Sequence, residues 1–109
     1  MKRLINYLLM VSVLIMSANV LAAADVANGQ LKSASCTACH GVGGDSTNPM
    51  FPRIAGQHAD YIIHALQSYK TAKRINPMMQ ATAAALSDED IVDLAAYFSE
   101  QEGLKTLGQ

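Results

Sequence analysis

The string Cys36-Thr37-Ala38-Cys39-His40 holds the only two cysteines of the chain, followed directly by one of its three histidines. Two thiols at this spacing can each form a thioether to a vinyl group of a haem, which places the next histidine beside the iron. Neutral imidazole ligates iron through one ring nitrogen, while the other commonly donates to a carbonyl that orients the ring. The string therefore predicts haem attachment through Cys36 and Cys39, with His40 as an axial ligand. Pro52, in the following loop, is the candidate for that carbonyl.

Two other uses of a C-x-x-C pair require features that this sequence lacks. A redox-active pair of the thioredoxin kind is expected within a βαβ unit, and no strand pattern of useful length is present. A structural disulfide or half of a zinc site is the second alternative. Neither a second cysteine pair nor a His-x-x-x-His pair follows to complete a metal shell. Haem attachment is therefore preferred to both.

The apolar pattern predicts an all-α domain of three to four helices joined by loops. A short first helix is predicted over 25–35 with Asp25 as its cap, and Gly29 within it indicates that another helix crosses closely. Residues 41–56 have the composition of a loop. A second amphipathic helix is predicted over 57–71. A second loop is predicted over 72–86, in which the small residues 81–85 favour a partly helical stretch.

The last helix has the clearest pattern. Ser87, followed three residues later by Asp90, resembles a capping box at its start. Apolar residues then repeat at helical spacing, at Ile91, Leu94, Ala95 and Phe98. Asp93 and Glu100 are predicted on the opposite side of this helix. The chain is expected to fray after Gly103.

Residues 1–24 have the features of a secretory signal peptide. Lys2 and Arg3 give a positive start, an apolar stretch follows to Val20, and small residues close it. Cleavage after Ala22 and cleavage after Ala24 both fit the rule for such leaders. The alternative is an uncleaved anchor, because the apolar run approaches the roughly 20 residues that span a bilayer. We therefore expect one domain over 25–109 in the periplasm, at the membrane only if the leader is retained.

Without the leader the chain keeps six basic and nine acidic residues, a formal net charge of −3. Nucleic-acid-binding surfaces are clustered basic patches, so nucleic acid is not an expected partner. About 85 residues remain, and domains of this size commonly depend on a staple or a cofactor. Since the chain has no Trp and only two Phe, a large buried cofactor would supply missing apolar volume.

Several strings beyond the haem motif make the chain resemble the class I cytochromes c. The resemblance is to small bacterial single-haem members and to one half of the two-haem respiratory members. The matching strings are Gly29, residues 36–41, residues 52–57, Tyr61, residues 74–79, residues 86–91 and residues 94–98. The resemblance implies a small cytochrome c fold around one haem c per chain, bound covalently through two thioethers. It also implies a contact between the first and last helices at Gly29, Leu94 and Tyr97.

The resemblance further implies a methionine sulfur as the second axial ligand, on the haem face opposite His40. Met50 follows His40 by only ten residues, in the loop on the same side, and is poorly placed to reach the opposite face. Met79 precedes Leu86 by seven residues, the spacing of the family, and is preferred to Met78, which remains the alternative. Thioether ligation favours Fe(II) and raises the reduction potential.

Other polar residues receive lesser roles. Arg53 and Arg74 are candidates for pairing with the haem propionates, because guanidinium pairs well with carboxylate. His58 is predicted on the inward side of a first helical turn, in a capping or hydrogen-bonding role, and His64 on the solvent side. Tyr61 and Tyr69 are predicted mainly as core residues.

The expected function is the periplasmic transfer of single electrons, by a carrier that is not an enzyme. With both axial positions filled, the iron has no open site for a substrate. The resemblance implies a quinol-oxidising complex or a dehydrogenase as electron donor, and a terminal oxidase or reductase as acceptor. Two alternatives remain: a haem enzyme or gas sensor with a labile sixth ligand, and a membrane-tethered subunit of a larger redox complex.

Overall fold

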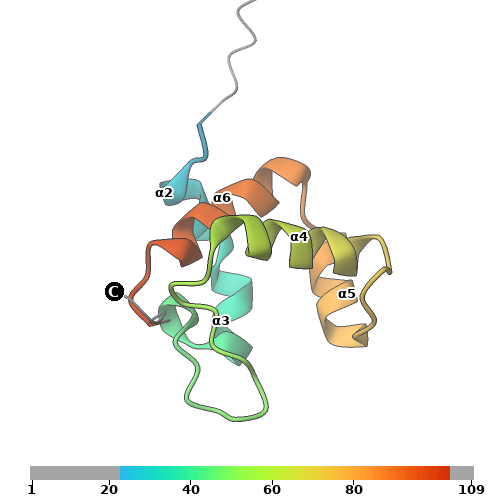
Figure 1. The fold of residues 1–109 in the computed structure, drawn as a ribbon, viewed down its shortest axis with the longest axis horizontal. Coiled ribbons are helices and arrows are strands. Elements are labelled where there is room, and N and C mark those ends of the chain that lie inside the picture. Colours follow the sequence, from blue (N-terminus) through green and yellow to red (C-terminus); the bar gives the residue numbers. More distant parts are fainter. Residues whose placement is uncertain (1–22, 104–109) are drawn as a thin grey trace, which may run out of the picture.

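The computed structural model describes residues 23–103, which form five α-helices, one 3-10 turn and no strand (Figure 1). The elements are α2 (Val26–Lys32), α3 (Ala34–His40), the 3-10 turn η1 (Val42–Gly44), α4 (Ala59–Lys70), α5 (Pro77–Ala84) and α6 (Asp88–Ser99). The predicted all-α class is confirmed, with one helix more than the three to four expected. Of the predicted leader, only Ala23 and Ala24 lie within the described residues. None of the helices in residues 23–103 is long and apolar enough to cross a membrane.

α2 and α6 cross at Gly29, as the sequence predicted. A Cβ atom at Gly29 would lie 2.1 Å from the Asp93 carbonyl oxygen and 2.9 Å from the Tyr97 Cβ. Leu94 and Tyr97 are both buried at this side of α6. The two helix backbones therefore meet more closely than any side chain at Gly29 would allow.

The hydrophobic core lies between α4 and α6. It consists of Ile62 from α4 and Leu94, Ala95, Tyr97 and Phe98 from α6. The rings of Tyr97 and Phe98 pack edge to face, with centroids 5.1 Å apart. The predicted apolar face of the last helix is confirmed, because Ile91, Leu94, Ala95 and Phe98 are each at most 3% exposed.

The prediction that Asp93 lies on the solvent side of α6 is wrong, because Asp93 is buried. Its Oδ1 accepts a hydrogen bond from the backbone N–H of Asp25, and its Oδ2 accepts one from Asn28 Nδ2, each at 2.7 Å. These two donors come from the start of α2, which the apolar spacing of α6 alone cannot reveal. Burial of the carboxylate is thus a consequence of the crossing.

Ser33 divides the predicted first helix into two helices. Its backbone N–H donates to the Gly29 carbonyl at 2.9 Å and ends α2. Its own carbonyl accepts from the N–H of Cys36 at 2.9 Å and begins α3. The C-x-x-C-H string therefore lies on a helix, whereas the predicted first helix stopped at residue 35.

α5 occupies much of the predicted second loop and packs mainly against α4. Asn76 caps it, because Asn76 Oδ1 accepts from the Met79 N–H at 3.1 Å, and Pro77 takes the first helical position, where its missing N–H costs little. Lys70 closes this segment, because its Nζ donates to the Leu86 carbonyl at 2.6 Å and lies 3.5 Å from Asp88 Oδ1. The end of α4 is thereby joined to the start of α6.

The predicted capping box at the start of α6 is present in full. The Asp90 N–H donates to Ser87 Oγ at 3.0 Å, and the Ser87 N–H donates to Asp90 Oδ2 at 3.1 Å. Asp90 Oδ1 also forms an ion pair with Lys32 Nζ of α2 at 3.1 Å. One carboxylate thus starts α6 and ties it to α2.

Asp90 makes the stability of this region sensitive to acid. The hydrogen bond from the Ser87 backbone, and next the one from the Lys32 side chain, lower the pKa of the Asp90 carboxyl below its ordinary value. A carboxylate of this kind stabilises the fold fully above its unfolded-state pKa of about 3.9, and the contribution is lost as pH falls through the lower folded-state value. We expect Asp90→Asn to lower the urea midpoint at pH 7. The difference from the parent protein should close progressively below about pH 4.

The matched control for this experiment is Glu89→Gln, in the same helical turn. The Glu89 carboxylate makes no hydrogen bond or ion pair among the described residues, so its loss removes only a charge near the helix start. An equal loss in the two variants at pH 7 would contradict a specific role of the capping box and the Lys32 pair.

Candidate haem site

α3 presents three potential haem-binding side chains on one face. Cys36 and Cys39 are three residues apart and Cys36 and His40 four apart, the spacings that align side chains along a helix. Both cysteines are free thiols of intermediate exposure. Burial raises the pKa of the Cys36 thiol, against a smaller lowering by the Ser35 hydroxyl, and the neighbouring Cys39 raises it further. Cys36 is therefore a neutral thiol at pH 7 in the haem-free chain.

The His40 ring is held in one orientation. Its Nδ1 lies 2.8 Å from the Pro52 carbonyl oxygen, and because a carbonyl only accepts, Nδ1 carries the proton. The Phe51 ring packs edge-on against it, with centroids 6.5 Å apart. In the neutral ring, Nε2 is then the nitrogen that is available to ligate a metal. The contact between His40 and Pro52 is the one expected from the sequence, whereas Phe51, next to Pro52, was not singled out.

The loop after α3 brings the Pro52 carbonyl back to the helix. The Gly44 carbonyl accepts from the N–H groups of Ile54 and Ala55, at 2.9 and 3.1 Å, and so fixes the returning segment of the loop. Gly44 has a φ of 81°, and a Cβ there would lie 2.6 Å from Ile54 Cγ1. The turn therefore requires glycine at this position on two counts.

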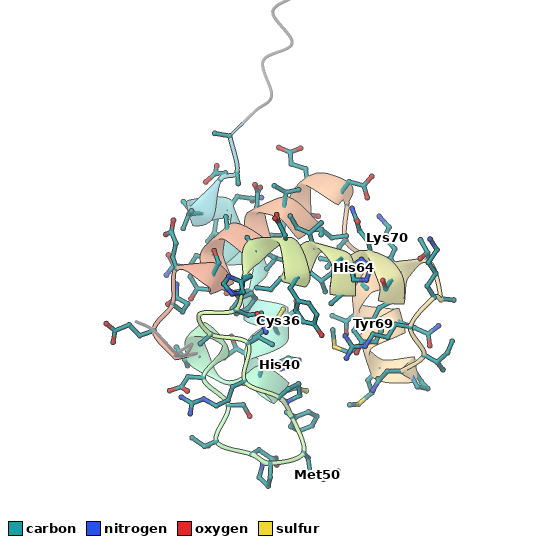
Figure 2. The ribbon with its side chains drawn as sticks, viewed as in Figure 1. Cys36, His40, Met50, His64, Tyr69 and Lys70 are labelled. Atoms are coloured by element: carbon teal, nitrogen blue, oxygen red, sulfur yellow. The ribbon has the colours of Figure 1, made fainter. Side chains whose placement is uncertain are left out.

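Across from α3, the second potential ligand lies on α5. Figure 1 shows α3 and α5 on the same side of α4 at separate positions along it, and Figure 2 shows Cys36 and His40 on the side of α3 turned towards α5. Met79 is half-buried in the first turn of α5, whereas Met78 is 59% exposed. Met50 is 80% exposed at the far end of the 41–56 loop, away from α5 (Figure 2). The fold thus places Met78 and Met79, but not Met50, on the element that faces α3.

The two arginines predicted to pair with propionates lie on the surface. Arg53 forms an ion pair with Asp45 of the same loop, and a propionate would have to share or replace that partner. The Arg74 guanidinium lies 4.8 Å from the centre of the Tyr69 ring, a cation–π contact at the α4 side of α5. Pairing of either arginine with a propionate stays a prediction.

The two remaining histidines are exposed, His58 just before α4 and His64 within it. His64 is exposed, as predicted. The prediction that His58 lies on the inward side is wrong, because His58 is exposed at the start of α4 and its side chain makes no capping hydrogen bond. Its backbone N–H instead donates to Gln57 Oε1 at 2.9 Å. Tyr61 is half exposed and does not belong to the core formed by the described residues.

The donor set on α3 and α5 fits a covalently bound haem. Two free thiols lie three residues apart, an imidazole beside them has its Nδ1 occupied and its Nε2 available, and a helix with two thioethers faces them. An all-helical fold with this site defines a c-type cytochrome. The family model described as Cytochrome c matches residues 26–102, and this chain belongs to the cytochrome c family. Membership of this family implies a covalently bound haem c, and Cys36 and Cys39 have the spacing that its attachment needs.

Among known proteins, the chain is 44% identical over 81 residues to cytochrome c4 of Pseudomonas aeruginosa, an alignment covering 74% of this chain and 40% of that relative. It is 41% identical over 83 residues to cytochrome c-554(548) of Halomonas halodenitrificans, covering 73% of this chain and all of that relative. The crystal structure of reduced cytochrome c4 from Pseudomonas stutzeri superposes with a TM-score of 0.70 at 42% identity, over 75% of this chain and 48% of that one. The chain therefore spans less than half the length of these cytochrome c4 relatives and resembles one half of the dihaem protein.

Proposed function

We propose that the chain is a periplasmic carrier of single electrons, with one haem c ligated by His40 and Met79. The observation that carries the proposal is the His40 ring, buried on α3 beside both cysteines, with its Nδ1 committed to Pro52 and its Nε2 free. The bound haem supplies the Fe(II)/Fe(III) couple. What remains for the chain is to hold the two axial ligands in place and to exclude water from the haem.

His40 acts as a rigid ligand. The Pro52 carbonyl fixes its tautomer, and Phe51 limits rotation of the ring. Fixed ligands reduce the rearrangement that accompanies a change in charge, which favours fast transfer of single electrons.

Met79 is the better placed of the two methionines on α5. Asn76 accepts from its N–H, which fixes the backbone at that residue, and its side chain is more buried than that of Met78. A thioether at this position stabilises Fe(II) and raises the reduction potential relative to a second histidine. Met78 is then a surface residue of the same helical turn, and it provides a matched control.

The partners are proposed from the relatives and from charge. One relative, named thiosulfate dehydrogenase electron acceptor, from Stutzerimonas stutzeri, is 36% identical over 77 residues, covering 68% of this chain and 35% of that relative. It supports a dehydrogenase as donor here. A quinol-oxidising complex is the other donor, and a terminal oxidase or reductase the acceptor. With the leader removed the net charge of −3 favours partners with a basic docking face.

Substitution of the two methionines tests this assignment. We expect Met79→Ala to abolish the sulfur-to-iron charge-transfer band at the red end of the oxidised spectrum. Loss of the thioether should also lower the reduction potential by an appreciable part of the roughly 0.8 V range that axial ligands span. Met78→Ala should leave both the band and the potential close to those of the parent. Optical spectra and redox titration of the purified holoproteins measure these effects.

Two results would contradict the assignment. If Met78→Ala removes the band and Met79→Ala does not, the axial ligand is Met78 and not Met79. If the reduced parent protein binds carbon monoxide rapidly at neutral pH, the sixth position is labile, and a haem enzyme or gas sensor is the better function.

A further inference from the structure

Asp93 is a buried carboxylate with only neutral hydrogen-bond donors. It is 3% exposed, and its two oxygens accept from the Asp25 N–H and the Asn28 side-chain amide, each at 2.7 Å. The lysines and arginines that form ion pairs within residues 23–103 pair with Asp90, Asp45 and Asp88, and none with Asp93. A buried carboxylate is costly unless a positive group accompanies it.

We propose that the export leader is removed between Ala24 and Asp25, and that the new α-ammonium group of Asp25 forms an ion pair with the buried Asp93 carboxylate. A leader-cleaving peptidase adds one water across this amide, so that Ala24 leaves as a carboxylate and Asp25 keeps the amine, which is protonated at neutral pH. The Asp25 nitrogen already lies 2.7 Å from Asp93 Oδ1. Processing thus replaces a neutral donor with a charged one without moving the chain. The inference rests on export of the proposed carrier, but not on its electron transfer.

The remaining contacts of Asp25 fix its nitrogen in this position. Its side-chain Oδ1 accepts from the Asn28 N–H at 3.0 Å, and its carbonyl accepts from the Gly29 N–H at 2.9 Å. Asp25 is therefore the cap of α2 and is held in place by three hydrogen bonds. Ala23 and Ala24 are exposed, so the amide bond before Asp25 is accessible to a peptidase. Small residues at positions 22 and 24 satisfy the cleavage rule.

Cleavage at the competing site, after Ala22, would give an N-terminal ammonium group with weaker ion pairs. An ammonium group on Ala23 would lie beside Asp88 and Glu89, because Ala23 and Ala24 line a shallow depression with these acids, Val92 and Asp93. Asp88 and Glu89 are exposed, and attraction to exposed carboxylates is weak and screened by salt. Asp93 would keep a neutral amide as its donor. The buried acid therefore favours a terminus at Asp25.

The first test is the terminus of the protein as a bacterium exports it. The full-length chain is expressed with its leader, and the mature holoprotein is examined by intact mass and N-terminal sequencing. We expect a single species that begins with Asp25. A terminus at Ala23 overturns this inference and leaves export intact, whereas a retained leader overturns cleavage as well. Neither result affects the charge-transfer band that tests Met79 as a ligand. The proposed electron-transfer function is therefore tested independently of this inference.

The second test is the ion pair itself. In the mature protein, the pKa of the Asp25 α-amino group, followed by NMR titration, should lie above the ordinary range of about 7.7–8.0. The Asp93 carboxylate is hydrogen-bonded to this nitrogen, the Asp25 carboxylate belongs to the same residue, and Asp88 and Glu89 line the neighbouring depression with Ala23 and Ala24. Asp93→Asn should therefore return the pKa of the α-amino group most of the way to its ordinary range, and Asp88→Asn should change it little. Equal effects of the two variants would overturn the inference.

A third measurement avoids any change at Asp93. A mature form that retains Ala24 keeps every side chain but has an amide at Asp25. We expect its folding equilibrium constant to be about tenfold lower than that of the form beginning at Asp25, the scale of a hydrogen bond to a charged group. Equal urea midpoints for the two forms would overturn the inference.

Discussion

Replacement of both Cys36 and Cys39 by serine will give a chain that carries no covalently bound haem. In the attachment that we propose, each thiol supplies one thioether, and serine cannot form this bond. The effect extends to folding, because only eight apolar residues are buried among residues 23–103, and a haem-free chain loses the apolar group against which α3 and α5 would pack. We expect the variant to lack haem by intact mass and in denaturing gels stained for haem, and to unfold at lower urea concentration than the parent holoprotein.

Ser35→Ala is the matched control for this experiment. Ser35 is exposed, and its hydroxyl lies 3.9 Å from the Cys36 sulfur, so this variant removes a contact in α3 without removing a thioether. It should retain a full complement of haem. A double-serine variant that still carries haem after denaturation would contradict attachment at Cys36 and Cys39.

Gly29→Ala will destabilise the holoprotein by at least about 3 kcal/mol, on the scale of severe overpacking. In an isolated helix the same change would stabilise the helix by up to about 1 kcal/mol. The sign of the change in stability therefore distinguishes the packing of α2 against α6 from intrinsic helix propensity. The added Cβ would lie 2.1 Å from the Asp93 carbonyl oxygen. That oxygen belongs to the backbone of α6 and cannot rotate away, so α2 and α6 must separate. Urea unfolding followed by circular dichroism measures the loss.

The exposed neighbour Gln30 provides the control for this substitution. Gln30→Ala lies in the same helix and should change stability by no more than about 0.5 kcal/mol. A Gly29→Ala variant as stable as the parent would mean that the crossing of α2 and α6 tolerates a wider separation than the structure shows.

The sequence was most informative where a residue pattern carries its own geometry. The spacing in the C-x-x-C-H string, the capping box at Ser87 and the apolar repeat of the last helix each depend on neighbours within a few residues, and the helical features are confirmed. The glycine in the first helix also predicted a crossing correctly. Family membership is shown by the match over residues 26–102.

Features that depend on distant contacts were missed. The spacing of α6 predicted Asp93 on the solvent side, since nothing local indicates that Asp25 and Asn28 donate to it. His58 was predicted inward from the pattern of α4, but the loop before it leaves the side chain exposed. The start of α5 had a local signal, the Asn76-Pro77 pair, but the helical stretch was predicted from the small residues 81–85 and therefore began too late. The iron ligands themselves stay predictions until the variants are measured.

The contact of Lys70 with Leu86 and Asp88 marks the boundary between two parts of the domain, whose amide hydrogens we expect to exchange with solvent at different rates. It closes residues 71–85 at their base, while α5 within them packs mainly against α4 and not on the α2–α6 crossing. Segments of this kind open as separate cooperative units, at a lower free energy than global unfolding. Amide hydrogens of α5 should therefore exchange earlier than those of α6, and Met79 belongs to the unit that opens first.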